Sequence, residues 1–168
     1  WLVQSIDLVF GVLYGIPVLK PQIASVASLP RNDREEKISI IFTARNEAPQ
    51  VRTALESMLT QNYPDYEVIA VNDRSTDETL SILQSFKNNS RLKVISIEEL
   101  PDGWLGKNHA LFKAYEKSSG EWLLFTDADV HFSPDTLRTT AAYVKQKEAD
   151  HLVILPKLIV HTWIENIF

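Results

Sequence analysis

The stretch ISIIFTARNEAP, residues 38–49, decides the fold, because it joins a buried strand to a helix through a polar corner. Residues 38–44 form a nearly continuous β-branched and apolar run, which is typical of a strand buried on both faces of a sheet. Pro49 suits the first turn of a helix that ends near Gln61. The apolar residues of this helix share one face: Val51, Leu55, Met58 and Leu59.

The same alternation of strand and helix continues outward along the chain. The pattern predicts strands at 66–72, 92–97, 121–126 and 151–156, and helices at 75–87, 108–118 and 133–149. Strands that alternate with helices of 10 to 15 residues indicate an α/β fold with a mostly parallel sheet covered on both faces.

Two of the predicted helices carry start signals. Ser75 and Glu78 have the spacing of a capping box, and Ser133 followed by Pro134 is typical of a capped helix start. We therefore expect Ser75 and Ser133 to cap the helices that follow them.

Composition narrows the function. The chain has 168 residues, 45% of them hydrophobic and 23% charged, which suits one globular domain. Its net charge of -5 argues against a nucleic-acid partner. Because it has no cysteine, thiolate metal sites, disulfides and thiol nucleophiles are excluded.

The amino-terminal segment is strongly apolar. Residues 8–19 form an uncharged run, and a bilayer span needs about 20 such residues. We expect residues 1–20 to be a membrane anchor truncated at its start, which would hold a cytoplasmic catalytic domain at the membrane. A hydrophobic helix packed on the domain and a cleaved signal peptide are the alternatives. Residues 21–37 read as a polar linker, and residues 38–168 as the domain.

Polar residues follow each of the first four predicted strands after residue 37. They stand in RNE at 45–47, NDRSTD at 72–77, EELPDGWLGKNH at 98–109 and DADV at 127–130. Ligands of parallel sheets bind outside the carboxyl ends of the strands. The sequence therefore predicts a ligand site along this edge.

The pair Asp127 and Asp129 points to a metal. Residues spaced i, i+2 in extended chain turn their side chains to the same side. Two carboxylates at a strand end suit Mg²⁺ or Mn²⁺, which complete their shells with substrate phosphates and water. The alternative is that each aspartate caps a turn.

Together, ISIIFTARNE, VNDRSTDET, DGWLGKNHAL and LLFTDADV resemble the motifs of inverting family 2 glycosyltransferases with the GT-A fold. The resemblance covers residues 38 to about 157. The DGWLGKNHAL loop resembles the membrane-associated branch with hopanoid-linked and carotenoid glycosyltransferases. The resemblance implies a GT-A-type nucleotide-binding sandwich, truncated at the carboxyl end, of which residues 38–168 are the donor-binding half.

The resemblance also implies residue roles. Arg45 and Glu47 match the motif that lines the nucleotide pocket, and Asp73 matches the aspartate that contacts the base. Lys107 and Asn108 match the loop that approaches the diphosphate or sugar. Asp127 matches the residue facing the ribose and sugar, and Asp129 the metal ligand.

Each role has a plainer alternative. Asp73 can be a turn or helix-cap residue, Lys107 a solvated surface lysine, and Glu47 a first-turn acid that stabilises the helix dipole. Trp104 can stack on a sugar or anchor its loop. His109 and His131 receive no role.

The implied reaction is metal-dependent transfer of a sugar, with inversion, from a nucleotide-diphosphate sugar, expected to be UDP-linked, to a hydroxyl acceptor. Membrane attachment makes a lipid or another hydrophobic alcohol the expected acceptor. The family's catalytic aspartate and its Q-x-x-R-W-like helix do not occur before Phe168. Asp150 and Glu165 have no matching surroundings, so the base is expected beyond Phe168.

Three other functions compete with this interpretation. A receiver-type signalling domain would need paired acids after the first strand, where RNE stands. A nucleotidyltransferase would need a Gly-rich basic loop there. A nucleotide-sugar binding module without transfer activity would share all the donor motifs.

Overall fold

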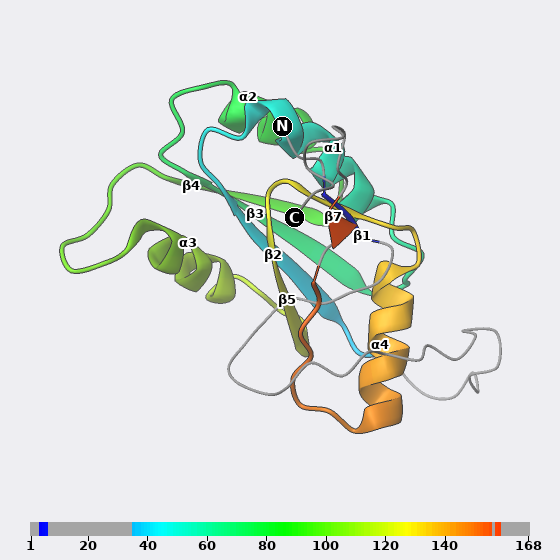
Figure 1. Cartoon of the computed structure of the whole chain (residues 1–168). Helices are drawn as coiled ribbons and strands as arrows, with labels where there is room; N and C mark the ends of the chain where they lie inside the picture. Colours follow the sequence, from blue (N-terminus) through cyan, green and yellow to red (C-terminus); the bar gives the residue numbers. More distant parts are fainter. Residues whose placement is uncertain (1–3, 7–34, 156, 159–168) are drawn as a thin grey trace, which may run out of the picture.

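The computed structural model describes residues 4–6, 35–155 and 157–158. The described residues form seven strands and four helices (Figure 1). In chain order these are β1 (Gln4–Ile6), β2 (Ile38–Ala44), α1 (Ala48–Leu59), β3 (Tyr66–Asp73), α2 (Thr79–Ser85), β4 (Leu92–Ile97), α3 (Gly106–Tyr115), β5 (Trp122–Asp127), β6 (Val130–Phe132), α4 (Thr136–Lys147) and β7 (Lys157–Leu158).

The central sheet has four parallel strands in the order β4-β3-β2-β5. Ile38 of β2 pairs with Tyr66 of β3 on one side and with Trp122 of β5 on the other. Each connection between these strands contains a helix, as parallel strands require. The predicted α/β fold with a mostly parallel sheet is confirmed.

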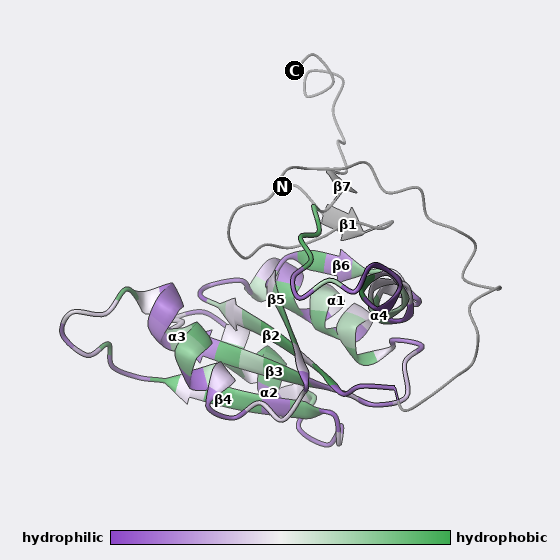
Figure 2. Ribbon diagram, turned by 90° about the horizontal axis from the view of Figure 1, so that it is seen from below, coloured by the Kyte–Doolittle hydropathy of each residue, from purple (hydrophilic) through white to green (hydrophobic). Residues whose placement is uncertain are grey.

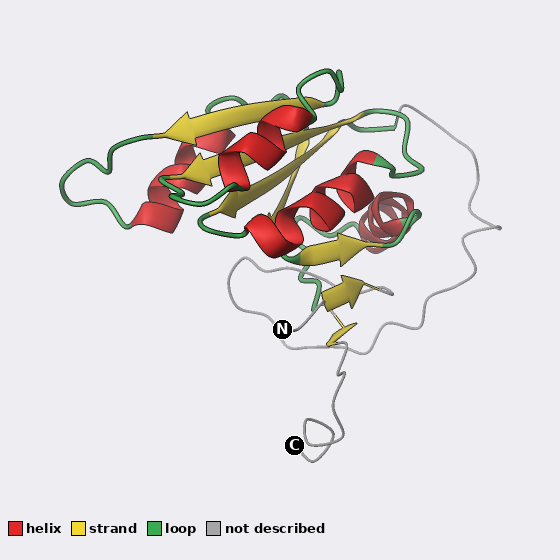
Figure 3. Ribbon diagram, turned by 90° about the horizontal axis from the view of Figure 1, so that it is seen from above, coloured by secondary structure: helices red, strands yellow, loops and turns green. Residues whose placement is uncertain are grey.

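Helices cover both faces of this sheet. The core on one face joins alternate residues of β2 and β3, such as Ile40 and Val68, to the buried side of α1, α2 and α4. The core on the other face joins Ile41 and Ile69 to Ala110 and Ala114 of α3. Figure 2 shows the central strands coloured mainly as hydrophobic, and Figure 3 shows the helices flanking them.

The two-residue period of the strands determines what α3 covers. On the α3 face, β3 places Glu67 at its beginning and Asp73 at its end, with Ile69 and Val71 between them. β5 places Leu123, Phe125 and Asp127 on the same face. The apolar side chains in the middle of the strands pack against α3, and the carboxylates lie at the strand ends.

A second, three-stranded sheet has the order β6-β1-β7. β1 is parallel to β6 and antiparallel to β7. The sequence pattern did not predict β1 or β6. Both are three residues long, which is too short for a periodic signal.

The predicted strand at 151–156 is wrong for residues 151–155, which pair with no strand. Leu152 and Ile154 are half-buried, and Ile154 packs against the core on the α4 side, while Val153 and Leu155 are exposed. An apolar sequence pattern does not identify the strand, if any, with which the backbone of that segment pairs. β7 begins only at Lys157.

The two predicted serine caps are also wrong. α2 begins at Thr79 with Glu78 in the N-cap position, and α4 begins at Thr136 with Asp135 in that position. The Ser75 hydroxyl accepts the backbone N–H of Asn46, 29 residues earlier, at 3.1 Å. Ser75 therefore bonds to the loop after β2 and does not cap α2.

The predicted membrane anchor at 1–20 lies outside the described residues except for 4–6, and the linker at 21–37 except for 35–37. Glu165 lies outside them as well. None of the four described helices has the length and apolar character needed to cross a bilayer.

Candidate functional site

The carboxyl ends of β2, β3 and β5 meet at one edge of the sheet, where a cavity of about 490 Å³ opens. The first turn of α3 forms its remaining wall. The lining residues are Thr43, Arg45, Glu47, Asp73, Arg74, Leu100, Gly106, Lys107, Asp127, Ala128 and Asp129. The predicted edge site therefore exists as a physical cavity, and six of the seven predicted site residues line it.

Asn108 is the predicted site residue that does not line this cavity. It is exposed on α3, one position after Lys107. Consecutive helical residues point about 100° apart, so two neighbours seldom face the same cavity. The structure brings Lys107 to the site and leaves Asn108 at its outer side.

Asp127 and Lys107 form an ion pair at the mouth of the cavity. The Lys107 Nζ donates to the Asp127 Oδ1 at 2.6 Å, and both side chains are more than half exposed, at 60% and 63%. Exposed pairs of this kind contribute only about 0–1 kcal/mol. Lys107 and Asp127 can therefore each leave this pair and contact a ligand at little cost in free energy.

Three carboxylates, one of them Asp127 itself, create a negative field around Glu47. Burial raises the pKa of Glu47, and the charges of Asp129, Asp77 and Asp127 raise it further. A cation bound near these groups would lower that pKa again. Asp127 and Asp129 offer the hard oxygen ligands that Mg²⁺ and Mn²⁺ prefer.

The described residues contain no group of three or more His, Asp or Glu side chains arranged as a metal cage. Two aspartates at the end of a strand suit an ion that draws its other ligands from a bound diphosphate and water. Asp127 and Asp129 are therefore donors of a kind that a divalent cation with further phosphate and water ligands could use.

Asp73 forms the back wall of the cavity together with Arg74. The Arg74 Nε and Nη2 donate to the two carboxylate oxygens of Asp73 at 2.7 and 3.1 Å. The Asp73 side chain is only 7% exposed, so its charge needs such a partner. Arg74 has a φ of 55°, which a non-glycine residue rarely adopts.

Gly106 packs against this pair at the start of α3. A Cβ added there would lie 2.6 Å from Arg74 Nη2 and 2.9 Å from Asp73 Oδ2. Sequence reasoning missed both Arg74 and Gly106, since neither the left-handed conformation nor the close approach can be read from residue types. The position of Arg74 directly after Asp73 was the available signal.

The loops after β2 and β3 hold each other in place. The Asn46 Oδ1 accepts the backbone N–H of Thr76 at 2.8 Å, and the Thr79 Oγ1 accepts the backbone N–H of Glu47 at 2.9 Å. An Asp77 carboxylate oxygen accepts the N–H of Ala48 at 3.2 Å. These contacts fix the backbone that carries Arg45 and Glu47.

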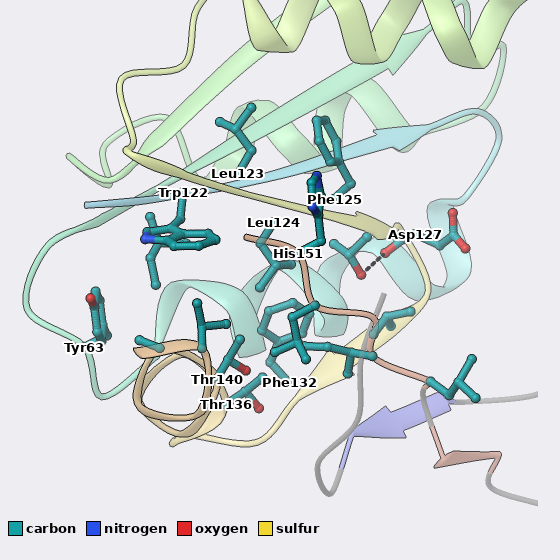
Figure 4. A pocket seen from close by; sticks show the side chains of 18 of the residues that line it. Tyr63, Trp122, Leu123, Leu124, Phe125, Asp127, Phe132, Thr136, Thr140 and His151 are labelled. Atoms are coloured by element: carbon teal, nitrogen blue, oxygen red, sulfur yellow. Dashed lines mark hydrogen bonds between the residues drawn. The ribbon is translucent and has the colours of Figure 1, made fainter. Parts of the chain in front are cut away.

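A second cavity of about 490 Å³ lies beside the first and shares Lys107 and Asp127 with it. Trp122 and Leu124 of β5 line it together with Phe132, residues of α4 and the segment 150–155 (Figure 4). It is mainly apolar, with polar groups such as Asp127 and His151 at its edge. An apolar cavity thus opens next to the carboxylates of the polar one.

The remaining candidates have structural explanations. Trp104 is partly exposed and contacts the rings of His109 and Phe112 at 5.3 and 5.4 Å between centroids, so it anchors its loop on α3. His109 is buried. Asp150 is exposed at the apolar cavity, away from the residues that line the polar one. The location of the base beyond Phe168 stays a prediction.

The chain also matches a known protein family and several of its relatives. Residues 39–160 match the model of the family described as "Glycosyl transferase family 2". The chain is 33% identical over 123 residues to the poly(ribitol-phosphate) beta-N-acetylglucosaminyltransferase TarS of Staphylococcus aureus, covering 72% of this chain and 21% of TarS. It is 32% identical over 138 residues to 4,4'-diaponeurosporenoate glycosyltransferase of Staphylococcus aureus, covering 80% of this chain and 36% of that protein. The chain thus spans about a fifth to a third of these relatives.

Solved structures agree. The crystal structure of TarS 1-349 in complex with UDP-GlcNAc matches with a TM-score of 0.57 and 31% identity, covering 67% of this chain and 32% of that one. The mannosyltransferase PcManGT from Pyrobaculum calidifontis, in complex with GDP-Man and Mn²⁺, matches with a TM-score of 0.60 and 27% identity, covering 71% of this chain and 36% of that one.

Proposed function

This chain belongs to glycosyl transferase family 2, and we propose that its polar cavity binds a nucleotide-diphosphate sugar, through a divalent cation, for transfer of the sugar to a hydroxyl acceptor. The observation that carries the proposal is the convergence of Asp73, Asp127 and Asp129 on one cavity with Arg45 and Lys107. Buried and half-exposed acids beside cations suit a ligand with a polar base at one end and a diphosphate at the other.

The donor's charge decides how the cavity would hold it. Asp127 and Asp129 would hold Mg²⁺ or Mn²⁺, which neutralises charge on a leaving diphosphate. Lys107 stands in the first turn of α3, where the helix dipole favours anions, and its ammonium can turn from Asp127 to a phosphate oxygen. Arg45 is exposed at the rim and adds a second cation.

The proposed transfer is a single displacement with inversion. The acceptor oxygen forms a bond to the anomeric carbon from the face opposite the diphosphate, whose bond to that carbon breaks. A general base must take the hydroxyl proton, which contributes about 10²–10⁴-fold to the rate. In this proposal the residues of the polar cavity hold the donor.

A hydrophobic acceptor is the second part of the proposal. The apolar cavity begins at Asp127, where the sugar would be released, and continues along Trp122 and Leu124 of β5. An acceptor with an apolar body and a terminal hydroxyl would suit it. The similarity to 4,4'-diaponeurosporenoate glycosyltransferase supports such an acceptor.

Membrane attachment through residues 1–20 belongs to the same proposal, because a hydrophobic acceptor resides in the bilayer. The support is the apolar composition of residues 8–19. Fractionation of cells that express the chain would place it with the membranes, and removal of residues 1–20 would release it. Release of the intact chain by buffer without detergent would overturn this part.

Calorimetry tests the donor site. We expect UDP or GDP to bind with Mn²⁺ or Mg²⁺ and to lose at least about tenfold in affinity when a chelator is added. Asp129→Asn removes an anionic ligand of the proposed cation and should abolish metal-dependent nucleotide binding. Asp135→Asn is the matched control, because Asp135 is an exposed residue at the start of α4 that accepts a hydrogen bond from Asn62.

Two results would contradict the donor site. Equal nucleotide affinity with and without chelator would show that binding does not need a metal. Equal affinities of Asp129→Asn and Asp135→Asn would show that Asp129 is not a ligand of the site. A binding module without transfer activity would show the same binding. Sugar transfer from a radiolabelled donor to extracted lipid distinguishes the enzyme from that alternative.

A further inference from the structure

Exposed apolar side chains gather on one outward surface, which α3 and the loop before it form. Of the six large hydrophobic side chains that are exposed among the described residues, four lie here and are named the α3 patch: Trp104, Leu105, Phe112 and Tyr115. We propose that the α3 patch lies in the interface of a lipid bilayer and holds both cavities at the membrane surface. This inference rests on the proposed hydrophobic acceptor and names the face of the domain that meets the membrane.

The four side chains of the α3 patch are contiguous. The ring centroids of Trp104 and Phe112 are 5.4 Å apart, and those of Phe112 and Tyr115 are 6.5 Å apart. Leu105 follows Trp104 directly and is 72% exposed. Single exposed apolar residues are ordinary on a protein surface, whereas a contiguous exposed group marks a place where another molecule binds.

The helix α3 carries apolar side chains on two sides. Ala110 and Ala114 pack on the sheet, while Phe112 and Tyr115 are exposed. Asn108, four positions before Phe112, is exposed in the same row. A helix that packs on a domain through one side normally has polar residues on the other. The outward row of α3 therefore favours a second apolar environment.

The types of side chain favour a bilayer interface as this environment. Tryptophan and tyrosine concentrate at the level of the lipid headgroups, because their rings are apolar and their N–H or O–H groups stay near water. Lysines beside such rings bury their stems and keep their ammonium groups at the phosphates. Lys107 stands in the first turn of α3, and the Lys113 Nζ lies 5.7 Å from the centroid of the Phe112 ring.

The charges around the α3 patch indicate the kind of bilayer. Residues 98–117 contain charged side chains of both signs: Glu98, Glu99, Asp102, Lys107, Lys113, Glu116 and Lys117. Two of the lysines already form ion pairs, Lys113 with Glu116 at 2.8 Å and Lys107 with Asp127 at 2.6 Å. Binding to anionic lipid needs a cluster of unpaired cations, whereas mixed charges complement zwitterionic headgroups. The bilayer contact is therefore mainly apolar.

The position of the α3 patch connects it to the proposed acceptor. Lys107 lines both cavities, and Leu111, which directly precedes Phe112, lines the apolar one. A bilayer on the patch would therefore lie beside the cavity that the acceptor enters. The loop between β4 and α3 projects from the domain in Figures 1 and 3, where a planar surface can reach it.

A fluorescent label tests the inference on the whole chain in phosphatidylcholine nanodiscs. Because the chain has no cysteine, one introduced cysteine carries one label. Asn108→Cys places a nitrobenzoxadiazole group in the outward row of α3, and Gln84→Cys places it on the exposed side of α2, which covers the other face of the sheet. The label at 108 should emit at shorter wavelength and be quenched by doxyl-labelled lipid. The label at 84 should do neither.

A double variant tests the apolar contact itself. Leu105→Ser with Phe112→Gln, labelled at 108, should lose the wavelength shift and the quenching. Val153→Ser removes an exposed apolar side chain outside the α3 patch and should leave both unchanged. Circular dichroism shows whether the variants fold. Should the double variant unfold, Leu105→Ser alone alters an exposed N-cap position, which serine suits, and should reduce the quenching.

Three results would overturn the proposal. The first is a label at 108 that stays as accessible to water as the label at 84. The second is a wavelength shift in the absence of lipid, because a second copy or another part of the chain would then cover the α3 patch. The third is quenching that requires anionic lipid and disappears in high salt, which would make the contact electrostatic.

Calorimetry of the unlabelled chain with Mn²⁺ and UDP or GDP separates this inference from the proposed function. Nucleotide binding combined with a label at 108 that stays in water would show that only the membrane surface is wrong. A label quenched by lipid in a chain that binds no nucleotide would support the membrane surface and contradict the proposed function.

Discussion

Glu67 is a carboxylate buried on the same face of the sheet as Asp73, at the opposite end of β3. Its oxygens accept hydrogen bonds from Ser39 and from the backbone and hydroxyl of Ser119, and they pair with Lys93 at 2.7 Å. Burial raises the pKa of Glu67, but the bonds from Lys93, Ser39 and Ser119 together outweigh burial and lower it to about 2. Glu67 thereby ties the connection between α3 and β5 to the sheet.

This arrangement predicts a loss of stability in acid. A carboxylate whose pKa is lower in the folded state stabilises the fold above its unfolded pKa of 4.5, and this contribution disappears as the pH falls toward 2. The loss should be on the order of 3 kcal/mol. Denaturant titrations between pH 7 and 2 measure it, and Glu67→Gln should flatten the profile over that window.

Glu116→Gln is the control for Glu67. Glu116 pairs with Lys113 on the surface, with both side chains more than 40% exposed, so its removal should leave the acid profile nearly unchanged. An unchanged acid profile in Glu67→Gln would show that other groups determine the acid stability.

Gly106 gives a second prediction for a single residue. An alanine methyl would press on Arg74 Nη2 and Asp73 Oδ2, and the flexible arginine would have to move away from the aspartate. Gly106→Ala should therefore reduce UDP or GDP affinity at least about tenfold and cost about 1–3 kcal/mol in stability. Calorimetry and denaturant unfolding measure the two effects.

Gly103→Asn is the matched control in the same loop. Gly103 has a φ of 81° and open space around its added Cβ, and asparagine tolerates left-handed backbone. Its substitution should leave nucleotide affinity unchanged and change stability by less than about 1 kcal/mol. Equal losses in both variants would mean that the loop, and not contact with the Asp73–Arg74 pair, controls binding.

The positions of single residues were predictable where a strand ends. Asp73 and Asp127 could be placed because alternation along β3 and β5 sends both to one face and the strand ends meet at one edge. Arg74 and Gly106 could not, because their roles depend on a rare backbone conformation and on a close contact between distant segments. The chemical roles of the predicted residues stay predictions.

At the scale of elements, the β2–α1 and β3–α2 loops form one unit. Asp77 is its centre, because its carboxylate accepts the N–H groups of Thr79 and Ala48, at 3.0 and 3.2 Å. Local sequence signals predicted Ser75 as the cap, and the side chain that binds the start of α2 is Asp77. Propensity ranks both residues highly at such positions, so only the neighbouring loop decides between them.

Asp77→Ala tests this unit. It leaves the N–H groups of Thr79 and Ala48 without their partner and should lower the midpoint of denaturant unfolding. Because the same loop positions Glu47 and Arg45, nucleotide affinity should fall as well. Glu78→Ala changes the adjacent exposed acid, which makes no side-chain cap bond, and should change both quantities little. Equal stability of the Asp77→Ala and Glu78→Ala variants would contradict the role of Asp77 in this unit.

At the scale of the whole molecule, the class of fold was predictable and the strand order was not. Alternating signals indicate parallel strands linked by helices, but they do not say that β2 lies between β3 and β5. Residues 151–155 show the same limit, because Ile154 packs at the α4 side although the segment enters no sheet. Periodicity reports which residues are buried, while the partner depends on the complete packing.

Ligand binding should stabilise the entire domain. Mn²⁺ and UDP or GDP together should raise the melting temperature by about 5–10 °C at a ligand concentration of 100 times the dissociation constant. Mn²⁺ alone should have a smaller effect, since Asp127 and Asp129 offer few ligands without phosphate oxygens. Thermal unfolding followed by circular dichroism measures both. An equal shift with Mn²⁺ alone would indicate a complete protein metal site.

The central place of β2 affects how the chain emerges during synthesis. β2 can pair with β3 once Asp73 has left the ribosome, but its other neighbour, β5, begins only at Trp122. At about 5–20 residues per second, roughly 2 to 10 seconds pass before that strand is made. Over this interval one edge of an apolar β2 has no partner, and such edges invite pairing with other chains. Slower translation between β3 and β5 should therefore lower the yield of folded protein.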